Sequence, residues 1–163
     1  MFSKFSRTRV LASGLFLFLS ASAFAQTSAP APFRLQALRA EAGQPSVYEI
    51  TLTFPQALAA DAEFVLEFPP AFDLSMLLVA GSPDITGGFT LAREGQRVRV
   101  KRSGAGERVE ANKPVRLRLG AVMNPDKLEA DYQISVQVQA SVSAALSEAQ
   151  KTKVEFQREL AKE

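Results

Sequence analysis

Apolar and polar residues alternate with a period of two through much of this 163-residue chain. In "VYEITLTF", residues 47–54, Tyr48, Ile50 and Leu52 fall on one face while Glu49 and Thr51 fall on the other. The same alternation recurs in "AEFVLEF" (62–68), "QRVRVKR" (96–102), "PVRLRLG" (114–120) and "YQISVQVQA" (132–140). Runs with one apolar and one polar face are typical of antiparallel sheet that is packed on one side and solvated on the other.

Weaker strand patterns fill the intervals between these runs. They occupy residues 33–40, 76–80, 89–94 and 152–157, and they are separated by turn-forming segments such as "AGQP", "GSPDITGG", "SGAGE" and "NPDK". Short strands at regular spacing predict an all-β fold, an antiparallel two-sheet β-sandwich of about 7–9 strands, with a closed barrel as the alternative.

The C-terminal part is ambiguous between strand and helix. Residues 144–162 are rich in Ala, Leu, Glu, Gln and Lys, which form helices well. Val154 and Phe156 nevertheless alternate with Lys153 and Glu155, which favours a last strand after an Ala- and Ser-rich connection. Residues 158–163 are expected to fray.

The N-terminal 25 residues predict a secretory signal peptide. Lys4, Arg7 and Arg9 precede an apolar stretch that is too short for a stable membrane anchor, and "ASAFA" supplies a small-x-small cleavage pattern ending at Ala25. No second stretch of spanning length follows, so we expect a mature chain without a transmembrane anchor, located in the periplasm or outside the cell. Residues 26–32 are expected to form a flexible lead-in to a domain at 33–157.

Removal of this leader changes the charge balance. The chain has 19 basic and 17 acidic residues, and three of the basic ones lie in the leader, which leaves 16 against 17 and a net charge of −1. A general nucleic-acid binder is expected to be far more basic, so nucleic acid is not a predicted partner. The remaining 138 residues suffice for one domain with a single core.

The residue inventory argues against an enzyme. The chain contains no His and no Cys, so it lacks the commonest general base, the commonest transition-metal ligand and the thiol nucleophile. No Ser-x-x-Lys or Gly-x-Ser-x-Gly motif is present. We expect no catalytic residues and no cofactor.

One cluster of oxygen-bearing side chains is a weak candidate for a Ca²⁺ site. Asn124, Asp126, Glu129 and Asp131 fall within eight positions. Calcium takes six to eight oxygens, and its loops usually include a glycine for the sharp turn, which this segment lacks. Asn124-Pro125-Asp126 is also a common turn sequence, so a simple turn before the strand at 132–140 is the alternative.

Cations concentrate between residues 93 and 118. Nine basic residues accompany three acids there: Arg93, Arg97, Arg99, Lys101, Arg102, Arg108, Lys113, Arg116 and Arg118 against Glu94, Glu107 and Glu110. If the strands at 96–102 and 114–120 pair with each other, five outward cations gather on one face: Arg97, Arg99, Lys101, Arg116 and Arg118. That face would suit an anionic envelope component or an acidic partner. The alternative is that these charges only keep the sheet soluble and protect its edges.

Tyr132 stands at the start of a late strand, directly after a turn. This is the position of a tyrosine corner in Greek-key sandwiches, in which the hydroxyl bonds to the backbone a few residues upstream. We therefore expect Tyr132 to be a structural lock.

Two segments resemble a repeat module of bacterial and archaeal cell-surface proteins. "TFPQALAADAEFVLEFPPAFDLS" and "LRLGAVMNPDKLEADYQISVQV" are similar to immunoglobulin-like or fibronectin-like β-sandwich modules over residues 47 to 140. The matching positions are Pro55, Leu58, Ala60, Phe68, Pro69, Phe72 and Asp73, then Gly120, Val122, Asn124, Pro125, Tyr132, Ile134 and Val136. The resemblance implies an extracytoplasmic structural or adhesive role without a cofactor.

Together these observations predict an exported, non-enzymatic sandwich that binds an envelope protein or serves as a structural module. The alternative is a sandwich that binds a glycan or another anionic ligand, with the basic face or the acidic turn as its site. Strand addition by a partner is a third hypothesis and needs an unpaired edge, best sought at 33–40 or 152–157.

Overall fold

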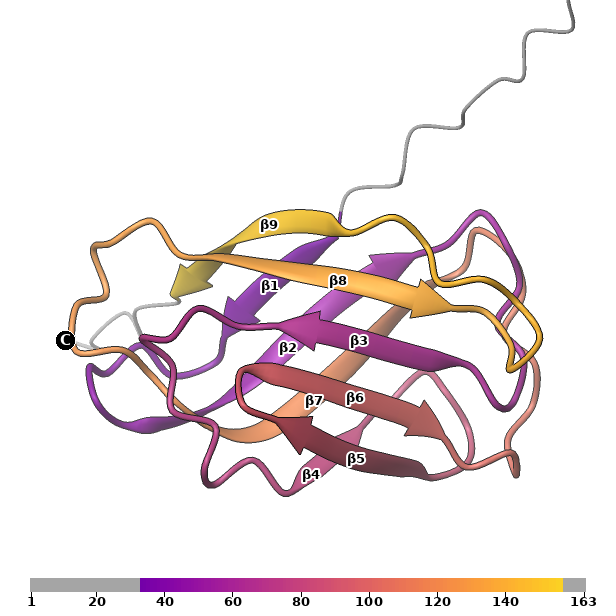
Figure 1. The fold of residues 1–163 in the computed structure, drawn as a ribbon, viewed down its shortest axis with the longest axis horizontal. Helices are drawn as coiled ribbons and strands as arrows, with labels where there is room; N and C mark the ends of the chain where they lie inside the picture. Colours follow the sequence, from indigo (N-terminus) through magenta and orange to yellow (C-terminus); the bar gives the residue numbers. More distant parts are fainter. Residues whose placement is uncertain (1–32, 157–163) are drawn as a thin grey trace, which may run out of the picture.

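The computed structural model describes residues 33–156 and shows an all-β fold, as the alternation predicts. The predicted leader (1–25), lead-in (26–32) and frayed end (158–163) lie outside the described residues, and the domain boundaries at 33 and 157 stay a prediction. Nine strands are present in this part of the chain: β1 Arg34–Ala37, β2 Pro45–Thr53, β3 Glu63–Glu67, β4 Val79–Gly81, β5 Phe89–Glu94, β6 Arg97–Arg102, β7 Pro114–Met123, β8 Gln133–Gln139 and β9 Gln150–Phe156 (Figure 1).

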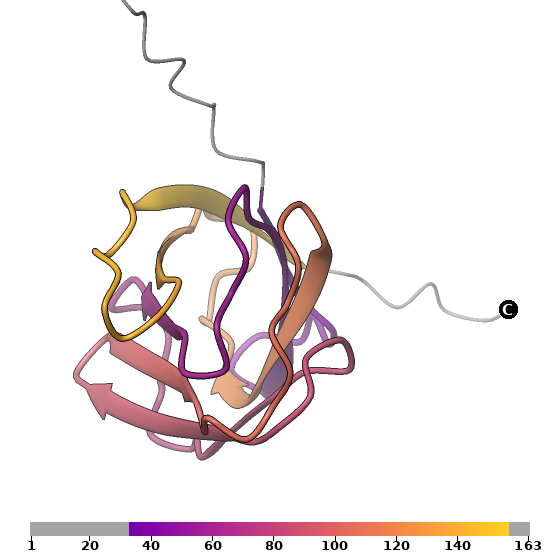
Figure 2. The ribbon, with the colours of Figure 1, turned by 90° about the vertical axis from the view of Figure 1, so that its right-hand side faces the viewer.

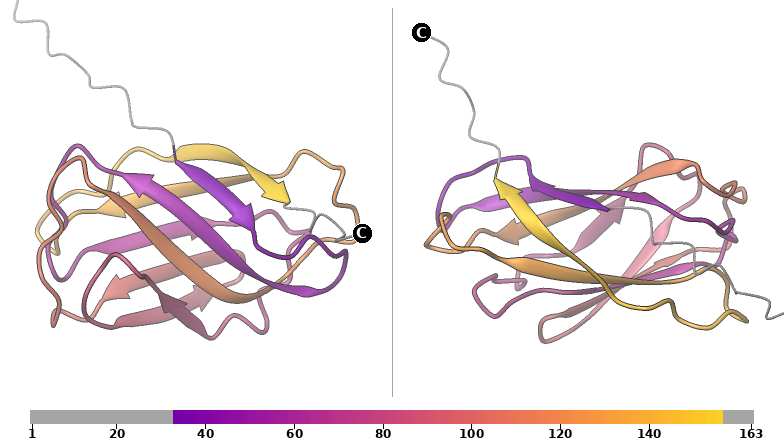
Figure 3. Two further views of the ribbon diagram at one scale, coloured as in Figure 1. Left: turned by 180° about the vertical axis from the view of Figure 1, so that it is seen from behind. Right: turned by 90° about the horizontal axis from the view of Figure 1, so that it is seen from above.

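The strands form two layers that are joined along one side. Hydrogen bonding runs in the order β4-β7-β2-β1-β9-β8-β3-β6-β5. The first sheet contains β4, β7, β2 and β1, and the second contains β8, β3, β6 and β5. Figure 2 shows the two layers end-on, and Figure 3 shows the first sheet from its outer side. At the opposite side β4 and β5 approach each other, so the sandwich is nearly closed.

β9 is the strand that joins the two sheets. Gln150–Lys153 pairs antiparallel with β8, and Val154–Phe156 pairs parallel with β1. The strand interpretation of the C-terminal segment is therefore confirmed through Phe156. The β1–β9 pair differs from the expected antiparallel pattern because the first and last strands enter the joint in the same direction.

The strand predicted at 76–80 is shorter and lies further along the chain. Leu74 and Leu77 are both buried and are joined by a turn from Leu77 N to Leu74 O. This turn holds the chain before Val79, where β4 begins. Burial of two leucines in a turn explains why the apolar run exceeds the strand.

The core lies between the sheets and is formed by the inward positions of the alternating runs. Phe64 and Leu66 of β3, Ile50 of β2 and Leu117 of β7 are all fully buried. Burying each of these side chains contributes about 1.5–3 kcal/mol relative to exposure. At one end of the core, rings pack edge to face, with Tyr48, Phe68 and Phe72 at centroid separations of 5.7 to 6.2 Å.

Strand addition by a partner requires a strand that is unpaired on one side, at the edge of a sheet. β1 is paired with both β2 and β9, and β9 is paired with both β1 and β8. Within the described residues, β1 and β9 therefore do not offer the unpaired edge that was expected at 33–40 or 152–157. β4 and β5 are the two ends of the hydrogen-bonded order.

Candidate functional site

The outer face of the second sheet carries alternating charge on neighbouring strands. Arg97 of β6 lies opposite Glu67 of β3 in the register. Arg99 lies opposite Val65, and Glu63 is two residues before Val65 on the same strand. Arg99 Nη1 is 2.9 Å from Glu63 Oε1, and Arg97 Nη2 is 3.8 Å from Glu67 Oε2. The hydrogen bond from Arg99 to Glu63 raises the pKa of that guanidinium. Lys101 is exposed on the same face.

The outer face of the first sheet carries two further ion pairs. Arg118 Nε is 2.7 Å from Glu49 Oε2 on β2, and the Glu49 side chain is largely buried. Arg116 binds Asp84 through Nε at 2.8 Å and Nη2 at 2.9 Å, and its backbone N–H donates to the same carboxylate at 2.9 Å. These hydrogen bonds from Arg116 lower the pKa of Asp84 to about 2.

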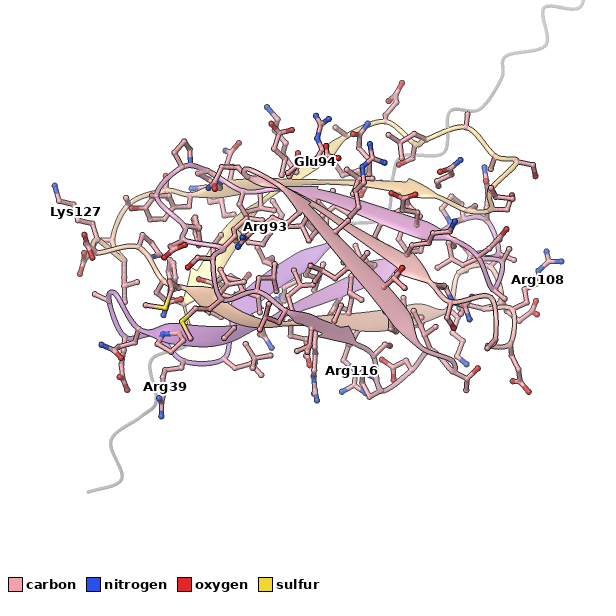
Figure 4. All side chains as sticks on the ribbon, turned by 60° about the horizontal axis from the view of Figure 1, so that its bottom comes forward. Arg39, Arg93, Glu94, Arg108, Arg116 and Lys127 are labelled. Carbon is pink, nitrogen blue, oxygen red and sulfur yellow. The ribbon has the colours of Figure 1, made fainter. Side chains whose placement is uncertain are left out.

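The expected five-cation face is therefore wrong in its geometry. β6 pairs with β3 and β5, whereas β7 pairs with β2 and β4, so the β6 cations Arg97, Arg99 and Lys101 lie on the opposite layer from Arg116 and Arg118. Figure 4 shows Arg116 on the lower side of the molecule and Glu94, the register partner of Arg97, on the upper side. The connection between β6 and β7 crosses from one sheet to the other, which period-two patterns cannot reveal.

The oxygen cluster at 124–131 is not assembled into a metal site. Asn124 is buried: its Oδ1 accepts a 2.6 Å hydrogen bond from the Tyr48 hydroxyl, and its Nδ2 donates to the carbonyls of Arg39 and Glu41 at 2.8 Å. Asp131 pairs with Lys153 at 3.0 Å. Asp126 and Glu129 are exposed, and no group of three or more acidic side chains suited to a metal is present within residues 33–156.

Tyr132 is half-buried and contacts the core through its ring. Its centroid lies 5.2 Å from that of Phe72 and 6.5 Å from that of Phe156, both edge to face. The hydroxyl of Tyr48 is buried and ties the segment after β7 to the sheet. Burial raises the pKa of Tyr48 well above its usual range, so the hydroxyl stays protonated and donates to Asn124. The corner role of Tyr132 stays a prediction.

Arg102 is a buried cation that holds three loops together. Only 2% of its surface is exposed, and its guanidinium donates to the carbonyls of Leu58, Ala59, Thr86 and Glu107 at 2.5 to 3.3 Å. Burial lowers its pKa. The sequence contains a signal for this position, because Arg102 continues the inward phase of Val98 and Val100.

Gly106 fits closely beside this guanidinium. A Cβ at residue 106 would lie 1.9 Å from the carbonyl oxygen of Thr86 and 2.8 Å from Arg102 Nη2, so only glycine is accommodated. Arg102 and Gly106 therefore fix the end of the sandwich that contains the 58–60, 86–88 and 104–107 loops, and their role is structural.

An exposed row of apolar residues crosses one end of the first sheet's outer face. Leu38, which follows β1, donates its backbone N–H to Val47 of β2, and Gly120 of β7 faces Val79 of β4. Val47 of β2 and Val79 of β4 are exposed, as is Leu38 directly after β1, and the segment before β4 exposes Met76 and Leu78. We call these six residues the apolar strip: Leu38, Val47, Met76, Leu78, Val79 and Gly120.

The apolar strip was not predicted from the sequence. The signal for it was small: Val47 is the first residue of its alternating run and has the outward phase of Glu49, and Gly120 has the outward phase of Arg116 and Arg118. The next row of the same face holds the Glu49–Arg118 ion pair. Contiguous exposed apolar surface bordered by polar residues is typical of an interaction site.

The described residues include no helix that could cross a membrane.

No protein-family model matches the sequence, and no curated protein matches it. Several solved structures resemble the fold. The chain is similar to a cohesin module from a Clostridium perfringens family 33 glycoside hydrolase, with 14% identity and a TM-score of 0.49, over 77% of this chain and 96% of that one. It is also similar to an immunoglobulin-like protein from Nocardia farcinica, with 13% identity and a TM-score of 0.46, over 76% and 97% of the two chains.

A third similar structure is the N-terminal domain of a Streptococcus gordonii adhesin, with 20% identity and a TM-score of 0.45 over 75% of this chain. The match spans only 32% of that adhesin chain.

Proposed function

We propose that this chain is an exported, non-enzymatic β-sandwich that acts as a protein-interaction module of the cell envelope or cell surface. The observation that carries this proposal is the apolar strip. Val79 is 63% exposed and Leu78 is 80% exposed, on a face where the neighbouring charges are already paired. Exposing aliphatic side chains to water is unfavourable, and covering them with a partner returns about 25 cal/mol for each Å² removed from water.

Export is supported by the N-terminal pattern. Three cations, a short apolar stretch and the "ASAFA" sequence match the order of a cleavable leader. The corresponding test is the mass of the protein recovered from its native host. Cleavage after Ala25 requires an N-terminus at Gln26, and an intact N-terminus at Met1 would contradict it.

The non-enzymatic part of the proposal is supported by chemistry. The chain has neither His nor Cys. Several carboxylates of the described part are already engaged in ion pairs with arginines on the outer faces: Glu49, Glu63, Glu67 and Asp84.

A glycan- or anion-binding role, with or without a weak Ca²⁺ site, has less support. Arg97 and Arg99 lie on one layer while Arg116 and Arg118 lie on the other, and each has a carboxylate partner. An anion would have to displace these carboxylates. An envelope protein that presents an apolar surface is therefore the preferred class of partner.

The proposal is tested by site-specific photo-crosslinking in the native host. A photoreactive amino acid replaces Val79 in the strip or, as a control, Val142, which is 68% exposed but lies in the connection after β8. We expect discrete protein adducts from position 79 and none of the same size from position 142. Equal patterns from the two positions would contradict the proposal.

A further inference from the structure

β5 is the longer of the two strands that end the hydrogen-bonded order. Among the described strands it pairs only with β6, and Figure 1 shows it at the lower border of the second sheet. β4 ends the order on the other side, so β4 and β5 approach each other without sharing a ladder. β4 has three residues whereas β5 has six, and shortness is one way in which proteins protect an edge. The edge of β5 is therefore the better place for a further strand.

Every second residue of β5 directs its backbone N–H and C=O away from β6. Directly before the strand, Ser103 N donates to Gly88 O at 2.9 Å, and these two residues continue the register of the β5–β6 ladder. Hydrogen-bonded pairs recur at every second position of an antiparallel ladder, so the even-numbered residues of β5 bond to β6. The odd-numbered residues direct their backbone groups to the open side: Phe89, Leu91 and Arg93.

β5 lacks most of the features that prevent strand addition. Its register with β6 runs from Phe89 to Glu94 without a shift, so no bulge bends the strand, and it contains neither Pro nor Lys. Arg93 has the inward phase, and an inward charge can protect an edge. Its Nη1, however, donates to the carbonyl of Leu74 in the turn before β4, so this charge is already engaged within the fold.

An extended backbone is the ligand that matches such an edge. N–H and C=O groups that repeat at every second residue are the complement of another β-strand. The side chains of β5 then determine which residues that strand should carry. Phe89 and Leu91 are half-buried and pack against the core, which favours apolar side chains opposite them.

Glu94 adds a preference for charge on the outer face. Its register partner is Arg97, but Arg97 Nη2 contacts Glu67 Oε2 at 3.8 Å. Glu94 itself forms no salt bridge within residues 33–156. A basic side chain directly opposite Glu94 on an added strand would be attracted to this carboxylate.

We propose that the open edge of β5 binds an extended segment of a partner protein as an additional antiparallel strand, with apolar residues beside Phe89 and Leu91 and a basic residue beside Glu94. The apolar strip lies on the first sheet, so this site is separate from it and does not rest on the proposed function. A single short strand makes few contacts, and a peptide of this kind is expected to bind with a dissociation constant of about 0.1–1 mM.

The test is an NMR titration of the isotope-labelled protein with a designed peptide as long as β5. The peptide has blocked ends, begins with lysine and then alternates leucine and threonine, so that its lysine meets Glu94 in the antiparallel register. The control peptide has the same sequence with N-methylated leucines, which removes the N–H groups that would donate to β5. We expect the amides of Leu91 and Arg93 to exchange rapidly in the free protein. At a peptide concentration about ten times the dissociation constant they should exchange about tenfold more slowly, and the control peptide should leave them unchanged.

Two substitutions at one position separate the backbone from the side chain. Leu91→Pro removes an outward N–H without removing a bond to β6, and proline is tolerated on an edge strand. Leu91→Ala keeps that N–H. We expect Leu91→Pro to raise the dissociation constant at least about tenfold and Leu91→Ala to raise it less than about threefold. The amide spectra of both variants verify that the fold is retained.

Three outcomes would overturn the proposal. Slow exchange of the Leu91 and Arg93 amides in the free protein at every dilution would mean that the edge is closed. Equal binding of the two peptides, or binding of neither at β5, would mean that the backbone of β5 is not recognised. Protection that grows with protein concentration in the absence of peptide would assign the edge to a second copy of the chain.

Discussion

The Tyr48 hydroxyl donates a 2.6 Å hydrogen bond to Asn124 Oδ1, which joins β2 to the turn after β7. Asn124 Nδ2 completes the connection through the carbonyls of Arg39 and Glu41, in the segment between β1 and β2. Every polar atom of this buried amide thus has a partner. The arrangement makes Asn124 an organiser of three chain segments at one end of the sandwich.

We expect Tyr48→Phe to lower the free energy of unfolding by about 1–3 kcal/mol, because it leaves buried Asn124 Oδ1 without its donor. Asn124→Ala removes three hydrogen bonds and is expected to cost about 2–5 kcal/mol. Urea denaturation measures both values. Gln137→Ala, which removes a side-chain bond on the surface, serves as the control with a change below about 0.5 kcal/mol. Equal losses in Asn124→Ala and Gln137→Ala would contradict the organising role.

A second prediction concerns Arg102. Arg102→Lys keeps the charge but cannot reach four carbonyls in the geometry of a guanidinium, so a loss of about 2–4 kcal/mol is expected. Arg97→Lys, at an exposed pair with a 3.8 Å separation, should change stability by about 0.5 kcal/mol or less. Chemical denaturation of the two variants compares the stability contributions of two arginines of β6, of which Arg102 is buried and Arg97 is exposed to solvent.

The Asp84–Arg116 pair predicts a pH dependence of stability. The pKa of Asp84 falls from its ordinary 3.8 to about 2 in the folded protein, so the unfolded chain binds this proton more tightly. The stabilisation is complete above the unfolded value and is lost as the pH falls from about 4 to about 2. The pair is partly solvated, so its share is about 1 kcal/mol or less.

The contribution of the Asp84–Arg116 pair is the difference in unfolding free energy between wild type and Asp84→Asn, which is measured at pH 6, 4, 3 and 2. The two curves should converge as the pH approaches 2. Arg116→Gln should remove the same pH-dependent component, and a difference that persists unchanged at pH 2 would show that Asp84 acts by another route.

Calcium is expected to leave thermal stability unchanged. Asn124 is fully engaged and Asp131 contacts Lys153, so a cation would have to break existing bonds before gaining ligands. Melting temperatures in millimolar Ca²⁺ and in EDTA should agree within about 1 °C, because a ligand that binds only the folded state would raise the melting temperature. A melting temperature that is several degrees higher in Ca²⁺ would support an ion site at 124–131.

The strands were predictable where alternation is strict. Val98 and Val100 of β6 and Leu117 and Leu119 of β7 face the core as their phase requires. The pairing of these strands was not predictable, because period-two patterns identify the faces of a strand and carry no information about its neighbours. This is why Arg99 and Arg116 were expected on one face, whereas they lie on the outer faces of two different sheets.

The functional residues were harder to predict for a related reason. A turn at Asn124 was one of two interpretations of the sequence, but the buried hydrogen bond of Asn124 is to Tyr48, which lies 76 residues away. Arg102 could have been recognised, since a charge in the inward phase of a strand needs buried partners. The apolar strip could not have been recognised, because Leu38, Val47 and Val79 come from three segments of the chain whose adjacency only the fold reveals.

The placement of β9 has a consequence for how the chain matures. Leu35 of β1 faces Val154 of β9, and the two residues are 119 positions apart. A chain that is synthesised from its N-terminus keeps β1 without its second neighbour until β9 has been made. Contacts this distant in sequence slow folding. The late joint therefore postpones closure of the sandwich until β9 has been made.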